Sequence, residues 1–254
     1  HEGDRDRRLR ARVVELRREG DALATDLDAL DAALAACGGA AATLCVVSTT
    51  SCFAPRGVDK LLELGRLCEA AGVPHVANNA YGVQCAACMK AIAACSANGR
   101  LDAFVQSTDK NFMVPVGGAV LASCSKKHGK ELIAKVSATY AGRASVAPIL
   151  DLFITLLHLG ADGWTRLLAE RAEIFPRLRD GVAAVAAAHG ERLMVTPHNG
   201  ISLAISLTPP PGGRKPSALG AALFTRLCSG ARVVAAAAAP KKVGGLEFAN
   251  YGAH

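Results

Sequence analysis

The sequence LDAFVQSTDKNF, residues 101–112, is an apolar run followed by a polar segment that carries Lys110. The apolar run predicts a buried strand. In α/β proteins the carboxyl ends of such strands face the crevice in which ligands bind. A lysine at this end of a strand contributes little to a hydrophobic core, so we interpret Lys110 as a residue with a chemical function.

A second apolar run ends in polar side chains at residues 76–80, Val-Ala-Asn-Asn-Ala. In a parallel sheet the ends of two such strands lie side by side, so Lys110 is expected to face Asn78. An amine opposite an amide is typical of a pyridoxal 5'-phosphate (PLP) site, where the lysine forms a Schiff base and a residue on the neighbouring strand holds the pyridine nitrogen. The alternative is a solvated loop lysine.

In the rest of the first half, apolar runs alternate with segments in which apolar residues recur at helical spacing. This order predicts an α/β fold with a mostly parallel sheet and helices on both faces. We expect Thr25 to cap the first helix and Gly72 to end the second. The predicted strands are residues 43–48, 74–77, 101–106 and 118–123, and the predicted helices are 26–36, 58–71, 83–96 and 126–139.

The second half has a different pattern, in which long segments with apolar residues at helical spacing precede short predicted strands. We assign residues 1–150 to part of a large PLP-binding domain, and residues 151–254 to connecting helices and part of a smaller α+β domain. The predicted elements are helices 148–159 and 164–189, the latter interrupted near Pro176, strands 193–195 and 201–207, a proline-rich loop 209–213, helix 217–228 and strand 231–234.

Composition excludes several classes of protein. About half of the 254 residues are apolar, enough for a sizeable core. The longest apolar stretches are shorter than the roughly 20 residues of a membrane span, and the first residues have no apolar signal core, so we expect no membrane segment and a cytoplasmic location. The net charge of +7 permits an acidic partner such as nucleic acid. The mixed charges from Arg5 to Arg18 favour a solvated helix face.

Nine cysteines, an odd number scattered among apolar residues, favour a reducing compartment. Cys85 and Cys88 have C-x-x-C spacing. A zinc site needs a second pair, and a redox motif needs its cysteine at a helix N-terminus after a strand. We therefore predict no metal and interpret the two cysteines as small helix-packing residues.

Several strings of the sequence are distinctive enough to indicate a family. They closely resemble the O-phosphoseryl-tRNA(Sec) selenium transferase family, in the same order and over nearly the whole chain from Val13 onward. The resemblance implies a fold type I PLP enzyme. The strings are STTSCFAPR (48–56), NNAYGVQ (78–84), DAFVQS (102–107), DKNFMVPVGG (109–118), YAGRAS (140–145), TPHN (196–199), LFTR (223–226) and SGARVV (229–234).

The resemblance assigns roles to the residues at the predicted strand ends. Lys110 becomes the Schiff-base lysine, and Asn78 stands where most fold type I enzymes carry an aspartate paired with the pyridine nitrogen. An amide stabilises a pyridinium less than a carboxylate does, which argues against aminotransferase chemistry. Ala80 is expected to pack on the ring face or to be an ordinary core alanine. Ser107 is expected to donate to the cofactor phosphate or to form a turn.

Further positions are weaker or more distant candidates. Gln84 and the segment 48–51 line the same strand ends. Arg143 is expected to bind a phosphate or carboxyl group of the substrate, the alternative being a surface arginine. The resemblance gives Arg232 a role in tRNA binding, with a surface arginine without ligand as the other possibility.

The implied reaction converts O-phosphoseryl-tRNA(Sec) to selenocysteinyl-tRNA(Sec). Lys110 removes the α-proton, phosphate leaves the β-carbon, and selenium from selenophosphate adds to the resulting alkene. The implied partners are the acceptor arm of tRNA(Sec) and other copies of the chain in a homotetramer. Two alternatives remain: a related PLP enzyme of the cysteine desulfurase or selenocysteine lyase type, and a tRNA-binding or antigenic scaffold without catalysis.

The resemblance also implies that some functional parts lie elsewhere. Fold type I enzymes have a phosphate-binding loop before the strand at residues 43–48, and the family's arginines for the phosphoseryl group are expected upstream. No such segment precedes Val13, and the C-terminal domain ends early. We therefore expect an internal piece of a longer enzyme, with an incomplete site for the cofactor phosphate.

Overall fold

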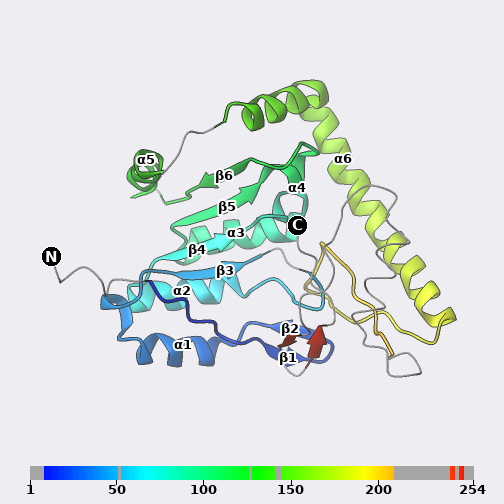
Figure 1. The fold of residues 1–254 in the computed structure, drawn as a ribbon, viewed down its shortest axis with the longest axis horizontal. Coiled ribbons are helices and arrows are strands. Elements are labelled where there is room, and N and C mark those ends of the chain that lie inside the picture. Colours follow the sequence, from blue (N-terminus) through cyan, green and yellow to red (C-terminus); the bar gives the residue numbers. More distant parts are fainter. Residues whose placement is uncertain are drawn as a thin grey trace.

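The computed structural model describes residues 9–50, 53–125, 128–140 and 145–208, together with two short strands near the C-terminus. Figure 1 shows the arrangement of its elements. In chain order they are β1 (Arg17–Glu19), β2 (Ala22–Ala24), α1 (Leu27–Ala36), η1 (Gly39–Ala41), β3 (Val46–Thr49), α2 (Leu61–Ala71), β4 (His75–Asn78), η2 (Gly82–Gln84), α3 (Ala86–Asn98), β5 (Ala103–Ser107), α4 (Thr108–Phe112), β6 (Ala119–Ala122), α5 (Gly129–Thr139), α6 (Ala147–Ala188), β7 (Lys241–Val243) and β8 (Leu246–Phe248).

The central sheet has the strand order β3-β4-β5-β6. β3, β4 and β5 are parallel, and β6 runs antiparallel to β5. The predicted α/β class with a mostly parallel sheet is therefore confirmed, with one antiparallel strand at the edge. Each predicted strand of the first half is present within a few residues of its expected position.

Helices α2 and α3 pack against one face of this sheet (Figure 1). Leu61 of α2 and Ile92 of α3 form a core cluster with Ala77 and Phe104 of the sheet. A second cluster joins α1 and α2 to Val46. Successive side chains of a strand point to opposite faces. Val47, on the face away from these clusters, is accordingly 65% exposed.

The N-terminus of α1 differs from the prediction. Asp26, not Thr25, is the N-cap residue, and its carboxylate accepts a hydrogen bond from the Ala29 amide at 2.9 Å. The Thr25 hydroxyl instead donates to the buried carboxylate of Asp59 at 2.9 Å and accepts from the Lys60 amide. Thr25 thus joins two distant segments, which local propensity does not reveal. The predicted C-terminal end of α2 at Gly72, with φ of 70°, is confirmed.

The charged N-terminal segment is not a helix in its described part. Residues 9–16 have no regular structure, and Arg17–Glu19 pairs with Ala22–Ala24 as an antiparallel hairpin. Gly20, with φ of 63°, lies in the two-residue turn. A Gly-Asp turn is a hairpin signal, so the expectation of a solvated helix face was wrong here.

The long helical region also departs from expectation at one point. Residues 147–188 form α6, in which Gly160 has the non-helical angles φ 61° and ψ −180°. The break at Gly160 confirms the predicted separation of helices 148–159 and 164–189. Pro176 lies inside a helical stretch, so the expected interruption near Pro176 was wrong. The predicted strands at 193–195 and 201–207 are reduced to a single bridge between Leu193 and Ile205. The predicted helix 217–228 and strand 231–234 lie outside the described residues.

Within the described part of the chain, no helix has both the length and the apolar character of a bilayer span.

A buried histidine of β4 contacts β3 and the segment just before β5. His75 Nδ1 lies 2.8 Å from the Arg100 carbonyl oxygen, which can only accept, so Nδ1 carries the proton. Nε2 therefore accepts from the Ser48 hydroxyl at 2.7 Å. Burial lowers the pKa of His75 below its ordinary value, against the opposing effect of the Arg100 hydrogen bond. The imidazole is thus neutral in the folded protein.

This histidine predicts a pH dependence of stability. Because its folded pKa lies below that of the unfolded chain, the unfolded state binds the proton more readily, and the free energy of unfolding falls as pH drops below about 6.5. His75→Gln keeps a donor for Arg100 and an acceptor for Ser48 but does not titrate. We expect urea unfolding to show a smaller loss of stability between about pH 7 and pH 5 for His75→Gln than for the unchanged chain. Equal losses in the two proteins would contradict a neutral buried His75.

Candidate functional site

The carboxyl ends of β4 and β5 meet at the edge of the sheet where Lys110 was predicted. Asn78 is in register with Val105, and β5 ends at Ser107. Helix α4 begins at the next residue and carries Lys110, so the lysine lies on a short helix and not in an open loop.

Two buried side chains fix α4 in place. The Thr108 hydroxyl donates to the Gly118 carbonyl oxygen at 2.9 Å. The Asn111 amide nitrogen lies 2.7 Å from both the Ala80 and the Ser107 carbonyl oxygens. Asn111 therefore ties the segment after β4 to the end of β5, which holds Lys110 beside both strand ends.

The Lys110 ammonium lies in a polar corner and is only partly exposed. Its Nζ atom is 3.3 Å from Ser107 Oγ and 3.3 Å from Asp109 Oδ2. It also lies 5.5 Å from the ring centroid of Tyr81, which in turn contacts the Phe53 ring edge to face. The structure thus places the Ser107 hydroxyl next to the Lys110 amine.

Asp109 was not singled out in the sequence, although it precedes Lys110 directly. Burial acts to raise the pKa of Asp109, but hydrogen bonds from Ser107 and Lys110 outweigh it, so the pKa lies below its usual value. The carboxylate is therefore ionised and forms an ion pair with the Lys110 side chain at 3.3 Å. The Ser107 hydroxyl donates to this same carboxylate.

The two neighbouring asparagines have different environments. Asn79 is fully buried, accepts from the Thr50 hydroxyl at 2.5 Å, and is part of the core. Asn78 is exposed at the end of β4, and its Oδ1 accepts from the Ala80 amide at 3.1 Å. The amide nitrogen of Asn78 is therefore the group that can donate to a ligand. Ala80 is half-buried beside it.

Gln84 links the lysine to α6. Its Nε2 atom donates to the Lys110 carbonyl oxygen at 3.0 Å, and its Oε1 atom accepts from Arg171 Nε at 3.1 Å. Arg171 also donates to the Gly200 carbonyl oxygen at 2.5 Å. Both ends of the Gln84 carboxamide thus bind protein groups. No sequence pattern pointed to Arg171, which lies 87 positions after Gln84.

The other predicted positions are buried in the core or lie beyond the described residues. Ser48 binds His75, Thr50 binds Asn79, and the Thr49 amide donates to Asp59 at 2.7 Å. Ser51, Arg143 and Arg232 lie outside the described residues. Within the part of the chain that the structure describes, no three His, Cys, Asp or Glu side chains gather at a point where a metal could bind.

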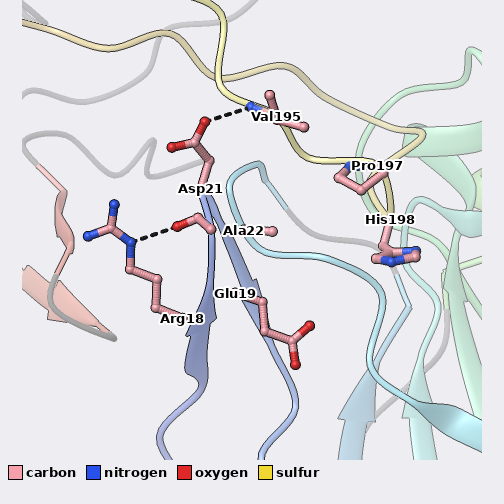
Figure 2. A pocket seen from close by; sticks show the side chains of 8 residues that line it. Arg18, Glu19, Asp21, Ala22, Val195, Pro197 and His198 are labelled. Atoms are coloured by element: carbon pink, nitrogen blue, oxygen red, sulfur yellow. Dashed lines mark hydrogen bonds between the residues drawn. The ribbon is translucent and has the colours of Figure 1, made fainter.

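A separate hollow of about 550 Å³ lies between the β1–β2 turn and residues 195–198 (Figure 2). Asp21 accepts from Arg192 at 2.5 and 2.7 Å and from the Val195 amide at 3.0 Å. The Arg192 hydrogen bonds and the Val195 amide hold the pKa of Asp21 well below its usual range. These contacts join the hairpin to the segment after α6.

Comparison with known proteins identifies the family. The family model of O-phosphoseryl-tRNA(Sec) selenium transferase matches residues 6–246. The chain belongs to the O-phosphoseryl-tRNA(Sec) selenium transferase family. The predicted resemblance is thereby confirmed.

Curated members of the selenium transferase family give the extent of the match. The Dictyostelium discoideum protein is 41% identical over 258 residues, covering 95% of this chain and 53% of the relative. The Caenorhabditis briggsae protein is 40% identical over 243 residues, covering 95% of this chain and 49% of the relative. The chain thus spans about half the length of the relatives that it matches.

Solved structures confirm the fold type I class. An archaeal selenium transferase superposes with a TM-score of 0.75 at 26% identity, covering 88% of this chain and 49% of that one. A structure of Oryza sativa TDC with PLP and tryptamine superposes with a TM-score of 0.61 at 15% identity, covering 88% of this chain and 47% of that one. At that identity the likeness shows the fold alone.

Proposed function

We propose that this chain supplies the lysine side of a PLP site in an enzyme that converts O-phosphoseryl-tRNA(Sec) to selenocysteinyl-tRNA(Sec) with selenophosphate. The observation that supports it most is the position of Lys110. In a selenium transferase family member, α4 carries an amine at the edge where the carboxyl ends of β4 and β5 meet, and β4 ends there at the exposed Asn78.

The side chains at this corner fit the chemistry of PLP. Lys110 offers the amine for covalent attachment, and Asn78 offers an amide donor for the pyridine nitrogen. Ala80 offers a small apolar surface for the ring. Ser107 offers a hydroxyl for the phosphate, although in this structure that hydroxyl binds Asp109. When bound, the cofactor supplies an electron sink for the substrate α-carbon.

The residues of this chain then have separate tasks. Lys110 Nζ takes the α-proton and holds it near Asp109, whose carboxylate stabilises the ammonium. Asn78 donates without a charge, so it stabilises a protonated ring less than an aspartate does; this favours elimination of phosphate over transamination. Gln84 positions Lys110 by donating a hydrogen bond from its Nε2 atom to the Lys110 carbonyl oxygen.

The remaining assignments concern the substrate and the assembly. We assign Arg143 to a phosphate or carboxyl group of the phosphoseryl moiety, and Arg232 to the acceptor arm of the tRNA. The net charge of +7 favours binding of an acidic partner. A cytoplasmic homotetramer with active sites shared between subunits completes the proposal.

A direct assay tests the reaction. The enzyme containing this chain is incubated with PLP, phosphoseryl-tRNA(Sec) and selenophosphate, and the aminoacyl group is identified by mass spectrometry after deacylation. We expect selenocysteine, and only when selenophosphate is present.

The same preparation separates the alternatives. Release of sulfide or selenide from free cysteine or selenocysteine, without turnover of the charged tRNA, would replace the proposal with a desulfurase or lyase. Binding of tRNA(Sec) without turnover of any substrate would replace the proposal with a tRNA-binding scaffold that has no catalytic activity.

A further inference from the structure

Gln84 holds the backbone of Lys110 near the C-terminal end of α4. The last four carbonyl groups of a helix have no partner inside it, and α4 spans only Thr108–Phe112, so the Lys110 carbonyl group needs a donor from outside the helix. Gln84 Nε2 supplies that donor at 3.0 Å. The Gln84 backbone amide also donates to Asn111 Oδ1 at 3.4 Å, so η2 contacts α4 through two hydrogen bonds.

The Gln84 carboxamide can bind Lys110 in only one orientation. Its oxygen accepts and its nitrogen donates, and the two atoms exchange places when the group rotates by half a turn. Arg171 selects the orientation, because a guanidinium has donors and no acceptor. Arg171 Nε donates to Gln84 Oε1 at 3.1 Å, which leaves Nε2 as the atom that faces the Lys110 carbonyl oxygen.

Arg171 is itself fixed by contacts on two sides. Its Nη2 atom donates to the Gly200 carbonyl oxygen at 2.5 Å, and its Cζ atom lies 5.6 Å from the ring centroid of Phe175 in α6. Gly200 lies close to the residue after Gln84, since a Cβ atom added to Gly200 would lie 3.2 Å from Cys85 Sγ. The guanidinium therefore ties α6 to the segment around Gly200 and to η2.

We propose that Arg171 is a positioning residue for Lys110, which acts by fixing the orientation of the Gln84 side chain. This role rests on the proposed function, in which Lys110 is the attachment point of the cofactor and the base. Arg171 holds Gln84, and Gln84 holds the carbonyl group of the lysine itself. A small displacement of a reacting group lowers the rate strongly even when its chemistry is unchanged.

The other anchors of α4 act on different residues. Thr108 and Asn111 bind backbone carbonyl groups through their own side chains, on either side of Lys110. Gln84 binds the Lys110 carbonyl group directly. Loss of the Gln84 hydrogen bond should therefore leave the fold intact and give the lysine more local freedom.

Substitutions of Arg171 in the enzyme that contains this chain test the effect on the rate. Arg171→Met removes both hydrogen bonds, and we expect selenocysteinyl-tRNA formation in a single turnover to slow on the order of 10–100-fold, because Lys110 is no longer held in place. Arg171→Lys keeps the charge but lacks the planar fork that reaches Gln84 and Gly200 together, so it should restore only part of the rate. Arg177→Met, at an exposed position of the same helix, is the control and should keep the rate.

Gln84→Glu separates positioning from a purely structural role. Its carboxylate still accepts from Arg171, now as an ion pair, but it has no donor for the Lys110 carbonyl oxygen. If Arg171 only joined α6 to the rest of the fold, this variant would react as fast as the unchanged enzyme. We expect instead a loss of rate comparable to that of Arg171→Met, with a urea midpoint no lower than that of Arg171→Met.

Labelling of the lysine amine gives a readout that needs neither cofactor nor substrate. The enzyme without PLP is reductively methylated with formaldehyde and cyanoborohydride, and peptide mass spectrometry follows each lysine. In Arg171→Met and Gln84→Glu we expect Lys110 to react about 2- to 10-fold faster than in the unchanged enzyme, which is the change in an equilibrium that corresponds to one hydrogen bond. The exposed Lys135 should react equally in all three proteins.

The two measurements distinguish failure of the Arg171 role from failure of the proposed function. If the unchanged enzyme forms no selenocysteinyl-tRNA, the proposed function is wrong, and the labelling still decides whether Arg171 positions Lys110. Equal labelling of Lys110 in the unchanged enzyme and in both variants would overturn the role of Arg171. Full activity of Gln84→Glu in an enzyme that is otherwise active would overturn it as well.

Discussion

Lys110→Ala is expected to abolish covalent attachment of PLP and to lower the rate of selenocysteinyl-tRNA formation by on the order of 10³-fold, because the variant loses the amine that serves as both attachment point and base. The fold should be retained, since Thr108 and Asn111, and not Lys110, hold α4 in place. Borohydride reduction followed by peptide mass spectrometry locates the cofactor, and single-turnover kinetics give the rate.

Lys110→Arg is the matched control for this experiment. Its guanidinium keeps the positive charge beside Asp109 but does not form a Schiff base at neutral pH. It should lose the cofactor as completely as Lys110→Ala does. A reduced cofactor adduct on another lysine in either variant would show that Lys110 is not the attachment point.

Gly82→Ala is expected to lower the free energy of unfolding by about 2–4 kcal/mol. A Cβ atom at this position would lie 1.8 Å from Asn79 Oδ1 and 2.6 Å from Asn79 Cγ. Asn79 is fully buried and accepts from Thr50, so it has no space to move without losing that hydrogen bond. Urea unfolding followed by far-UV circular dichroism measures the change.

Gly181→Ala provides the comparison for Gly82. It lies in α6, where an added Cβ would meet nothing within 4 Å. Alanine has the higher helix propensity, so we expect a gain of up to about 1 kcal/mol. If Gly82→Ala lost no more stability than Gly181→Ala, η2 would accommodate an added methyl group and Asn79 would not be rigidly packed.

Features of the fold that depend on local sequence pattern could be predicted. The apolar runs at 74–77 and 101–106 predicted β4 and β5 because a buried parallel strand is apolar on both faces. Lys110 and Asn78 were predicted to meet because both follow such strands. The antiparallel direction of β6 was not predictable, since it depends on the path of the chain between Phe112 and Ala119.

Contacts between distant segments account for most of what the sequence did not show. Arg171 reaches Gln84 across 87 positions, and Thr25 bonds Asp59 across 34, and neither residue differs locally from its neighbours. The β1–β2 hairpin was missed for another reason: its strands are only three residues long, and charged residues dominate the first of them. The acidic partner of the lysine, Asp109, was visible in the sequence, and its proximity to Lys110 was the available signal.

The direct junction of β5 with α4 determines how the lysine moves. No loop separates Ser107 from Thr108, and Asn111 binds backbone carbonyl groups on both sides of the site. The Lys110 backbone therefore does not swing, and any displacement of Nζ comes from rotation about its own side-chain bonds. Such rotations take picoseconds to nanoseconds, whereas loop or domain closure takes microseconds to milliseconds. Movement of the lysine should thus be far faster than turnover, and a slow step in the cycle should be sought in the substrate or in other parts of the enzyme.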